Sequence, residues 1–334
     1  MNELIKSLVE AYGPSGFEDQ VRQLIRPIVE PLADEITTDA LGNLIVYKKG
    51  TADSDERQKV MIAAHMDEIG VMVTHITEDG FLRFTNIGGV RRQTLQGGRV
   101  QFSDGTIGVI YHDRLENAAH VHPLDKHFID VGASSPEDCP VSVGDAAIFV
   151  RPFFAQNGRL TAKSMDDRIG CVVAIESLRR LENSPHDCYF VFSVQEEVGT
   201  RGAQAAAQRL SPDIGIALDV TMTGDTPKSA TMPVSLGKGA AIKVKDSGMI
   251  SHPGLVRLMR QRAEENEIAY QLEVLDGGTT DARPMQIANA GCAASCISIP
   301  CRYVHSQSET VDAADVESCV ALLTAVLSNP ISLT

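Results

Sequence analysis

The chain has 334 residues, of which 43% are apolar, and its formal net charge is −14 at pH 7. This length allows a large core and two domains, and the acidic balance excludes nucleic acid as a partner because no basic stripe could neutralise phosphates. No apolar run is long enough to span a bilayer, so we expect no membrane partner either.

The amino terminus and the cysteines predict a cytoplasmic protein. The first segment, MNELIKSLVEAYG, is amphipathic and lacks the basic start and apolar centre of a signal peptide. Seven cysteines, an odd number without the spacing of a disulfide framework, indicate reduced thiols. Cys292, Cys296 and Cys301 match no zinc spacing, so we interpret them as core residues.

The first 69 residues predict the start of an α/β domain. Helices are expected over residues 1–12 and 17–32, followed by a hairpin with strands over 36–38 and 44–48. An apolar strand over 60–64 then ends at the segment His65-Met66-Asp67.

Residues 70–162 differ in character from the segments on either side. Short alternating segments are separated by turn pairs such as Asp79-Gly80 and Asp104-Gly105, and helical periodicity is nearly absent. This pattern predicts a small all-β barrel or sandwich inserted into the α/β domain.

The α/β pattern resumes after residue 163. Apolar strands are expected over residues 189–194, 214–218 and 296–299, and helices over 169–181, 203–210, 252–265 and 315–327. We therefore expect a mixed sheet flanked by helices, built from residues 1–69 and 163–334, which form one discontinuous catalytic domain.

Four predicted strands deliver a histidine or a carboxylate at or just past the same end. These residues are His65, the pair Glu196-Glu197, Asp219 and His305. Functional groups gather at the carboxyl ends of strands in open α/β sheets. The non-functional alternatives are a solvated glutamate pair and a loop histidine. Chance, however, would not place all four groups at the carboxyl ends of their strands.

Together with Asp166, which precedes the helix at 169–181, these groups suit two divalent metal ions. The expected ligands are His65, Asp166, Glu197, Asp219 and His305, with one carboxylate shared between the ions. A mixed nitrogen and oxygen set suits zinc, cobalt or manganese better than calcium.

Two further carboxylates are expected to support the metal site and its chemistry. Asp67 could accept the second ring N–H of His65 and fix its tautomer, although it could also be a surface carboxylate. Glu196, next to a ligand but not itself one, would act as the general base.

Eight motifs across the chain carry a family resemblance. They are GPSGFE (13–18), DALGN (39–43), AAHMDEIG (63–70), MDDRIG (165–170), QEEVGTRGA (195–203), ALDVT (217–221), GGTTDA (277–282) and SIPCRYVHSQSE (298–309). On these the chain resembles the co-catalytic dimetal aminopeptidases of the tetrahedral (TET-type) family, which includes glutamyl and deblocking aminopeptidases and members labelled endoglucanase. The resemblance implies a zinc-peptidase-like fold and a metal-dependent enzyme that releases amino-terminal residues from peptides.

The resemblance also implies the same five ligands with Asp166 as the bridging residue, Glu196 as base and Asp67 as orienting carboxylate. It implies that the β insert mediates dimerisation and that homodimers assemble into a homododecamer. A related dimetal amide hydrolase or deacylase, or a non-catalytic assembly protein, are the alternatives. Arg283, where a small residue is common, either pairs with an acidic surface neighbour or reads a substrate carboxylate.

Overall fold

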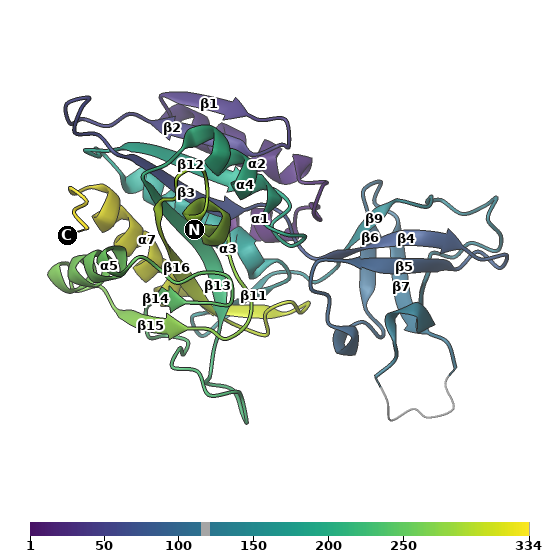
Figure 1. Ribbon diagram of the computed structural model, residues 1–334. Coiled ribbons are helices and arrows are strands. Elements are labelled where there is room, and N and C mark those ends of the chain that lie inside the picture. The colour runs from purple at the N-terminus through teal and green to yellow at the C-terminus, as the bar shows by residue number, and fades with distance from the viewer. Residues whose placement is uncertain (115–120, 334) are drawn as a thin grey trace.

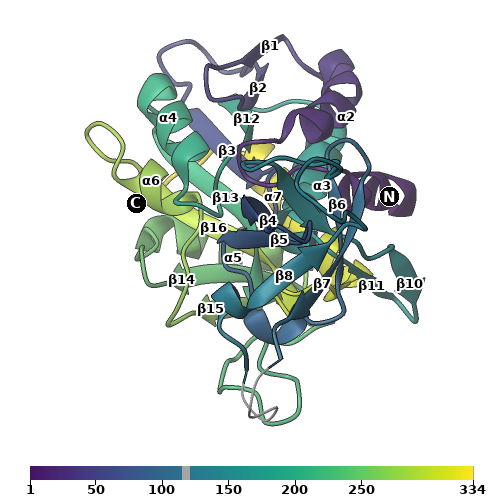
Figure 2. The same cartoon turned by 90° about the vertical axis from the view of Figure 1, so that its right-hand side faces the viewer.

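The computed structural model describes residues 1–114 and 121–333, so residues 115–120 of the predicted insert and residue 334 lie outside the described parts. The described chain forms an α/β unit around an eleven-stranded mixed sheet and a closed six-stranded antiparallel barrel. Figure 1 shows the barrel projecting from one side of the α/β unit, and Figure 2 looks onto it. The predicted fold class is confirmed.

The centre of the large sheet consists of four parallel strands. In spatial order they are β12 (Asp187–Ser193), β3 (Lys59–His65), β13 (Ile214–Met222) and β16 (Ala293–Arg302). These strands include the four apolar runs of the sequence, which are continuous because helices cover both faces of the sheet. Parallel pairing places all four carboxyl ends at one edge.

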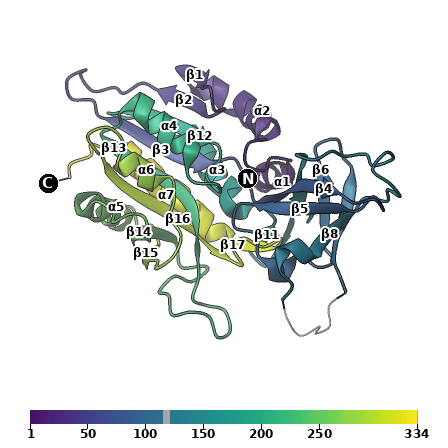
Figure 3. The same ribbon diagram turned by 45° about the vertical axis from the view of Figure 1, so that its right-hand side comes forward.

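Seven further strands complete this sheet. They are β1 (Glu35–Thr38), β2 (Leu44–Lys48), β10 (Phe154–Gln156), β11 (Arg159–Ala162), β14 (Ala240–Lys245), β15 (Tyr270–Val274) and β17 (Glu309–Asp312). The sequence-based boundary at residue 162 assigned β10 and β11 to the insert. Both instead join the large sheet through the pairing of β11 with β17, so by hydrogen bonding they belong to the α/β unit. Figure 3 shows β11 and β17 on the side of the sheet nearest the barrel.

The helices form two layers. One face of the sheet is covered by α1 (Asn2–Glu10), α2 (Asp19–Val29), α3 (Met165–Arg180), α5 (Pro253–Glu265) and α7 (Ala313–Leu327), and the other by α4 (Arg201–Leu210) and α6 (Ala282–Gln286). Within β3, Ile62 belongs to the first core and Met61 to the second, as strand alternation requires. None of the described helices is long and apolar enough to cross a membrane.

The barrel has its own hydrophobic core. Its strands in order are β4 (Gly70–Ile76), β5 (Leu82–Ile87), β8 (His127–Asp130), β7 (Ile107–His112), β6 (Arg99–Phe102) and β9 (Ala146–Phe149). Phe84, Phe102 and Phe149 are buried inside it. The outer face of β7 leaves apolar side chains exposed, at 47% for Ile107, 44% for Val109 and 48% for Tyr111. Closure of the barrel leaves no unpaired strand edge, but this outer face of β7 leaves apolar side chains open to solvent.

A buried ionic cluster ties the chain where it enters and leaves the insert. The Glu68 carboxylate accepts hydrogen bonds from Lys163 Nζ at 2.8 and 2.9 Å, from Ser164 Oγ at 2.5 Å and from Arg168 at 3.2 Å. All four side chains are buried. Because Glu68 precedes β4 and Lys163 follows β11, this cluster fixes both crossings against the α/β unit.

Candidate metal centre

The predicted site residues converge at the carboxyl edge of the four parallel strands. His65 is the last residue of β3 and lies opposite Ser193, the last residue of β12, so the pair Glu196-Glu197 follows immediately beside it. Asp219 is in β13, opposite Ser298 of β16, and His305 follows the end of β16. Residues from four separate parts of the sequence are thus brought together by strand register.

Asp166 lies between the two imidazoles. Its Oδ1 atom is 3.1 Å from Nε2 of His65, and its Oδ2 atom is 3.3 Å from Nε2 of His305. Nε2 of His305 is also 3.3 Å from Glu197 Oε2. A carboxylate that offers one oxygen to each side is the arrangement expected of a bridging ligand.

Two groups of possible ligand atoms meet the distance requirements of a metal site within the described residues. One comprises Asp166, Glu197 and His305, and the other His65, Asp167 and Asp219, with the atoms of each group within 4.8 Å of one another. Asp167 was not among the predicted ligands. Both Asp167 oxygens accept hydrogen bonds from backbone amides, one from His65 at 3.2 Å and one from Gly170 at 3.1 Å. Because these oxygens are already engaged, we favour Asp166 as the carboxylate that would share an ion with His65.

The turn that carries Glu196 and Glu197 is held by side chains from the amino-terminal segments. Four consecutive amides each donate to a side-chain oxygen: Val194 to Asn43 (3.0 Å), Gln195 to Glu18 (3.1 Å), and Glu196 and Glu197 to the two oxygens of Asp67 (2.9 and 3.1 Å). Gln195 has a positive φ of 56°, a conformation that needs such support in a residue with a side chain.

Asp67 therefore does more than the sequence predicted. Nδ1 of His65 lies 3.1 Å from the backbone oxygen of Asp67 and 3.4 Å from its carboxylate. The carboxylate also accepts a hydrogen bond from Ser15 Oγ at 2.6 Å. One buried side chain thus faces the first histidine and orients both glutamates of the turn.

Burial and neighbouring charges shift the pKa values of several groups in the cluster. Burial raises the pKa of Asp219 well above its usual value and Asp166 adds to the shift, while burial likewise raises the pKa of Glu196 well above its usual value. Burial lowers the pKa of His305, but the hydrogen bonds that its ring donates to Asp166 and Glu197, together with the charges of these carboxylates, outweigh burial and raise the pKa to about 12. Glu197 Oε1 is buried without a hydrogen-bond partner among the described residues. Divalent cations would stabilise these carboxylates, and the nitrogen and oxygen donor set fits zinc or cobalt.

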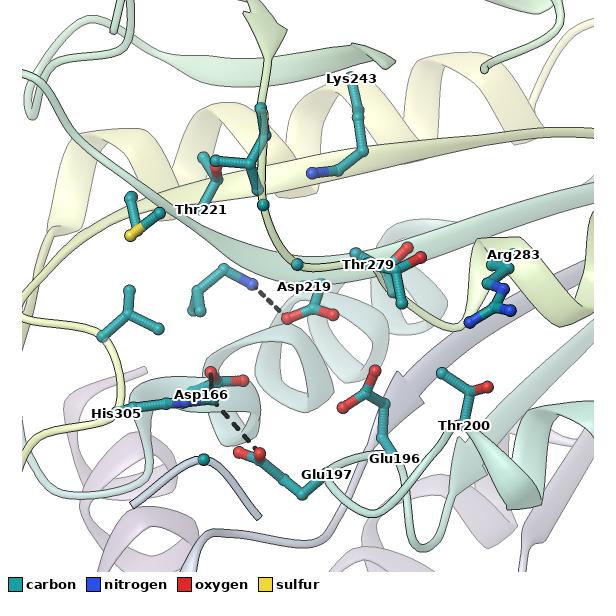
Figure 4. Close-up of a pocket in the computed structure, with 18 of the residues that line it drawn as sticks. Asp166, Glu196, Glu197, Thr200, Asp219, Thr221, Lys243, Thr279, Arg283 and His305 are labelled. Atoms are coloured by element: carbon teal, nitrogen blue, oxygen red, sulfur yellow. Dashed lines mark hydrogen bonds and ion pairs between the residues drawn. The ribbon is translucent and has the colours of Figure 1, made fainter. Parts of the chain in front are cut away.

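A cavity of about 510 Å³ opens above the cluster. Figure 4 shows Asp219 and Glu196 between His305 on one side and Arg283 on the other. Glu196 belongs to neither ligand group, and its Oε2 atom is 3.9 Å from Nε2 of His65. Arg283 lines the cavity from α6, and none of the acidic residues that the structure describes forms an ion pair with it.

The barrel forms part of the cavity wall. After β5 the chain passes the candidate ligands so closely that a Cβ atom on Gly89 would lie 2.3 Å from Nδ1 of His305, and one on Gly88 would lie 2.9 Å from Glu197 Oε2. Gln307 donates to the backbone oxygen of Thr94 at 2.9 Å and fixes the same loop. Gly89 and Arg91 line the cavity itself.

Sequence reasoning missed the residues that support the ligands. Glu18, Asn43 and Glu309 bind backbone amides around the site, and each lies within one of the family motifs. Membership of those motifs was the available signal, but it did not reveal which atoms each side chain contacts.

Comparisons with known proteins identify similar sequences and structures. The sequence profile of the family described as M42 glutamyl aminopeptidase matches residues 42–322. The lysyl aminopeptidase of Pyrococcus furiosus is 39% identical over 340 residues, covering 97% of this chain and 96% of that protein. An aminopeptidase structure from Desulfurococcus kamchatkensis has a TM-score of 0.94 at 42% identity, covering 98% and 94% of the two chains. The TET1 peptidase of Pyrococcus horikoshii, which can assemble into a tetrahedron or a large octahedral shell, has a TM-score of 0.86 at 34% identity, with 98% of each chain covered.

Proposed function

This chain belongs to the M42 glutamyl aminopeptidase family, and on that premise we propose that it releases amino-terminal residues from peptides with water activated by two divalent ions. The observation that carries this proposal is the position of Asp166, whose two oxygens face the imidazoles of His65 and His305 at 3.1 and 3.3 Å. His65 and Asp219 would hold one ion, Glu197 and His305 the other, and Asp166 would bridge them. Zinc or cobalt suits this set best, and manganese is also compatible.

The chemistry divides between the ions and the protein. When bound, two divalent ions lower the pKa of water and polarise a carbonyl oxygen. Glu196 accepts the proton that the attacking water loses and transfers it to the leaving amine. Asp67 supports both steps, since it orients the Glu196 amide and faces Nδ1 of His65, which fixes the tautomer of that ring.

Arg283 supports a preference for an acidic amino-terminal residue. Its guanidinium lines the cavity on the side opposite His305 and has no ion-pair partner among the described residues. A substrate carboxylate can pair with a guanidinium in bidentate geometry, whereas the ammonium of a lysine side chain is repelled by it. We therefore assign Arg283 to the recognition of Glu or Asp.

We propose that the barrel mediates dimerisation and that dimers assemble into a homododecamer. The exposed apolar face of β7, formed by Ile107, Val109 and Tyr111, is suited to burial against a second copy. We also propose a cytoplasmic location, which the seven cysteines support because none of them is paired in a disulfide.

The decisive experiment compares substrates and metals. The purified protein is stripped of metal with a chelator and assayed on Glu-, Leu- and Lys-p-nitroanilide and on N-acetyl amino acids, before and after addition of zinc or cobalt. We expect no activity without metal and restored activity on the free-amine anilides. Hydrolysis of only the N-acetyl substrates would establish a deacylase instead, and absence of any hydrolysis in the metal-loaded protein would indicate an assembly protein without this activity.

A further inference from the structure

Glu309 connects two segments that carry site residues far apart in the sequence. It is the first residue of β17 and is 1% exposed. Its Oε2 atom accepts a hydrogen bond from the backbone amide of Asp166 at 2.9 Å, and its Oε1 atom accepts one from the backbone amide of His305 at 2.7 Å. A single carboxylate therefore fixes the main chain of both residues relative to each other.

Neither of these two segments is held by regular secondary structure. Asp166 has a non-helical ψ of 106° at the start of α3, where backbone amides have no helical carbonyl to bind. His305 has a positive φ of 60°, which a residue with a side chain adopts only when its surroundings impose it. His65 and Asp219, by contrast, lie within the strand ladders of β3 and β13.

The two oxygens of Glu309 are both engaged by N–H groups, so its geometry is that of a support and not that of a ligand. We infer that Glu309 is a positioning residue for the ion that Asp166, Glu197 and His305 would hold, and that it acts through the backbone of Asp166 and His305. This inference rests on the proposed two-ion function. The ion at His305 depends on two ligands fixed by Glu309, whereas the ion at His65 and Asp219 depends on only one, Asp166.

The variants Glu309→Gln and Glu309→Ala test this selectivity. Glutamine keeps the shape and one acceptor but turns an NH2 donor toward a backbone N–H, and alanine removes both bonds. Val311→Ala is the matched control, because Val311 is buried in the same strand and its truncation loosens β17 without touching either hydrogen bond. His305→Ala supplies the reference for a protein that lacks one ion.

The measurement is calorimetric titration of the metal-free, full-length protein with Co²⁺, with folding of each variant checked by circular dichroism. We expect wild type and Val311→Ala to bind two ions. In Glu309→Gln one ion should bind about 10–100-fold more weakly, as is usual when a residue supporting a ligand is lost, and the other should be nearly unchanged. Glu309→Ala should resemble His305→Ala.

Four results would overturn this role. Equal affinity of Glu309→Gln and wild type for both ions would show that the hydrogen bonds do not position the ligands. Equal weakening of both ions would indicate a general charge effect of the carboxylate, and the same losses in Val311→Ala would indicate destabilisation of β17. A wild-type protein that takes up fewer than two ions would overturn the proposed function as well, so the two failures are distinguishable.

Discussion

Replacement of Glu196 by glutamine should separate catalysis from metal binding. The side chain belongs to neither ligand group, and the bond from its backbone amide to Asp67 does not depend on the carboxylate. Glutamine has the same shape but cannot accept the proton from water. General-base catalysis contributes about 10²–10⁴-fold in rate, which corresponds to roughly 3–6 kcal/mol in the activation barrier at about 1.4 kcal/mol per tenfold. We expect kcat on Leu-p-nitroanilide to fall by that factor.

The control is the neighbouring variant Glu197→Gln. Glu197 Oε2 lies 3.3 Å from Nε2 of His305 within a ligand group, so this variant should lose affinity for one ion as well as activity. Metal content after dialysis and kcat at saturating Co²⁺ are measured for both variants and for wild type. A Glu196→Gln protein with a full metal complement and near-normal kcat would refute the assignment of the base, and one that loses metal would identify Glu196 as a ligand.

Three further outcomes are expected. Arg283→Ala should reduce kcat/KM for Glu-p-nitroanilide by roughly 1–3 kcal/mol in free-energy terms while leaving Leu-p-nitroanilide unchanged, and an equal effect on both substrates would exclude recognition by this residue. Val109→Asp places a charge in the exposed apolar face of β7 and should reduce particle size in light scattering, so an unchanged oligomer would mean that the face lies outside the interface. Lys163→Met should lower the free energy of unfolding in urea by about 3–5 kcal/mol because it removes a buried partner of Glu68. Arg179→Met, which breaks an exposed pair with Glu176, should cost less than about 1 kcal/mol, and similar losses in both variants would contradict this reasoning.

The central strands could be predicted from the sequence, whereas several outer strands could not. β3, β12, β13 and β16 read as continuous apolar runs because both of their faces are covered. β14 and β15 carry Lys243 and Glu273, which pair across the strands in register and are both buried. Such charged residues interrupt the apolar pattern, and only the fold shows that each neutralises the other.

The same contrast holds at the candidate site. The five expected ligands are recognisable because each follows or lies within a readable strand or begins a helix. The supporting contacts depend on tertiary structure: Glu309 binds the amide of a residue 143 positions away, and Asn43 binds one 151 positions away. Residue type and local spacing contain no signal for such partners, so the roles of Glu309, Glu18 and Asn43 could not be predicted.

The close passage of Gly88 and Gly89 along Glu197 and His305 limits how far the insert can be treated as a separable module. In a chimaera that received the barrel of a relative, a side chain at either position would collide with Glu197 or His305. The backbone of the grafted loop must therefore match the recipient's catalytic pocket to within a few tenths of an ångström. A second contact adds to this restriction, because the Tyr12 hydroxyl donates to the backbone oxygen of Ala146 in β9 at 2.9 Å. A grafted barrel must therefore match the recipient both at the loop that Gln307 holds at Thr94 and at β9.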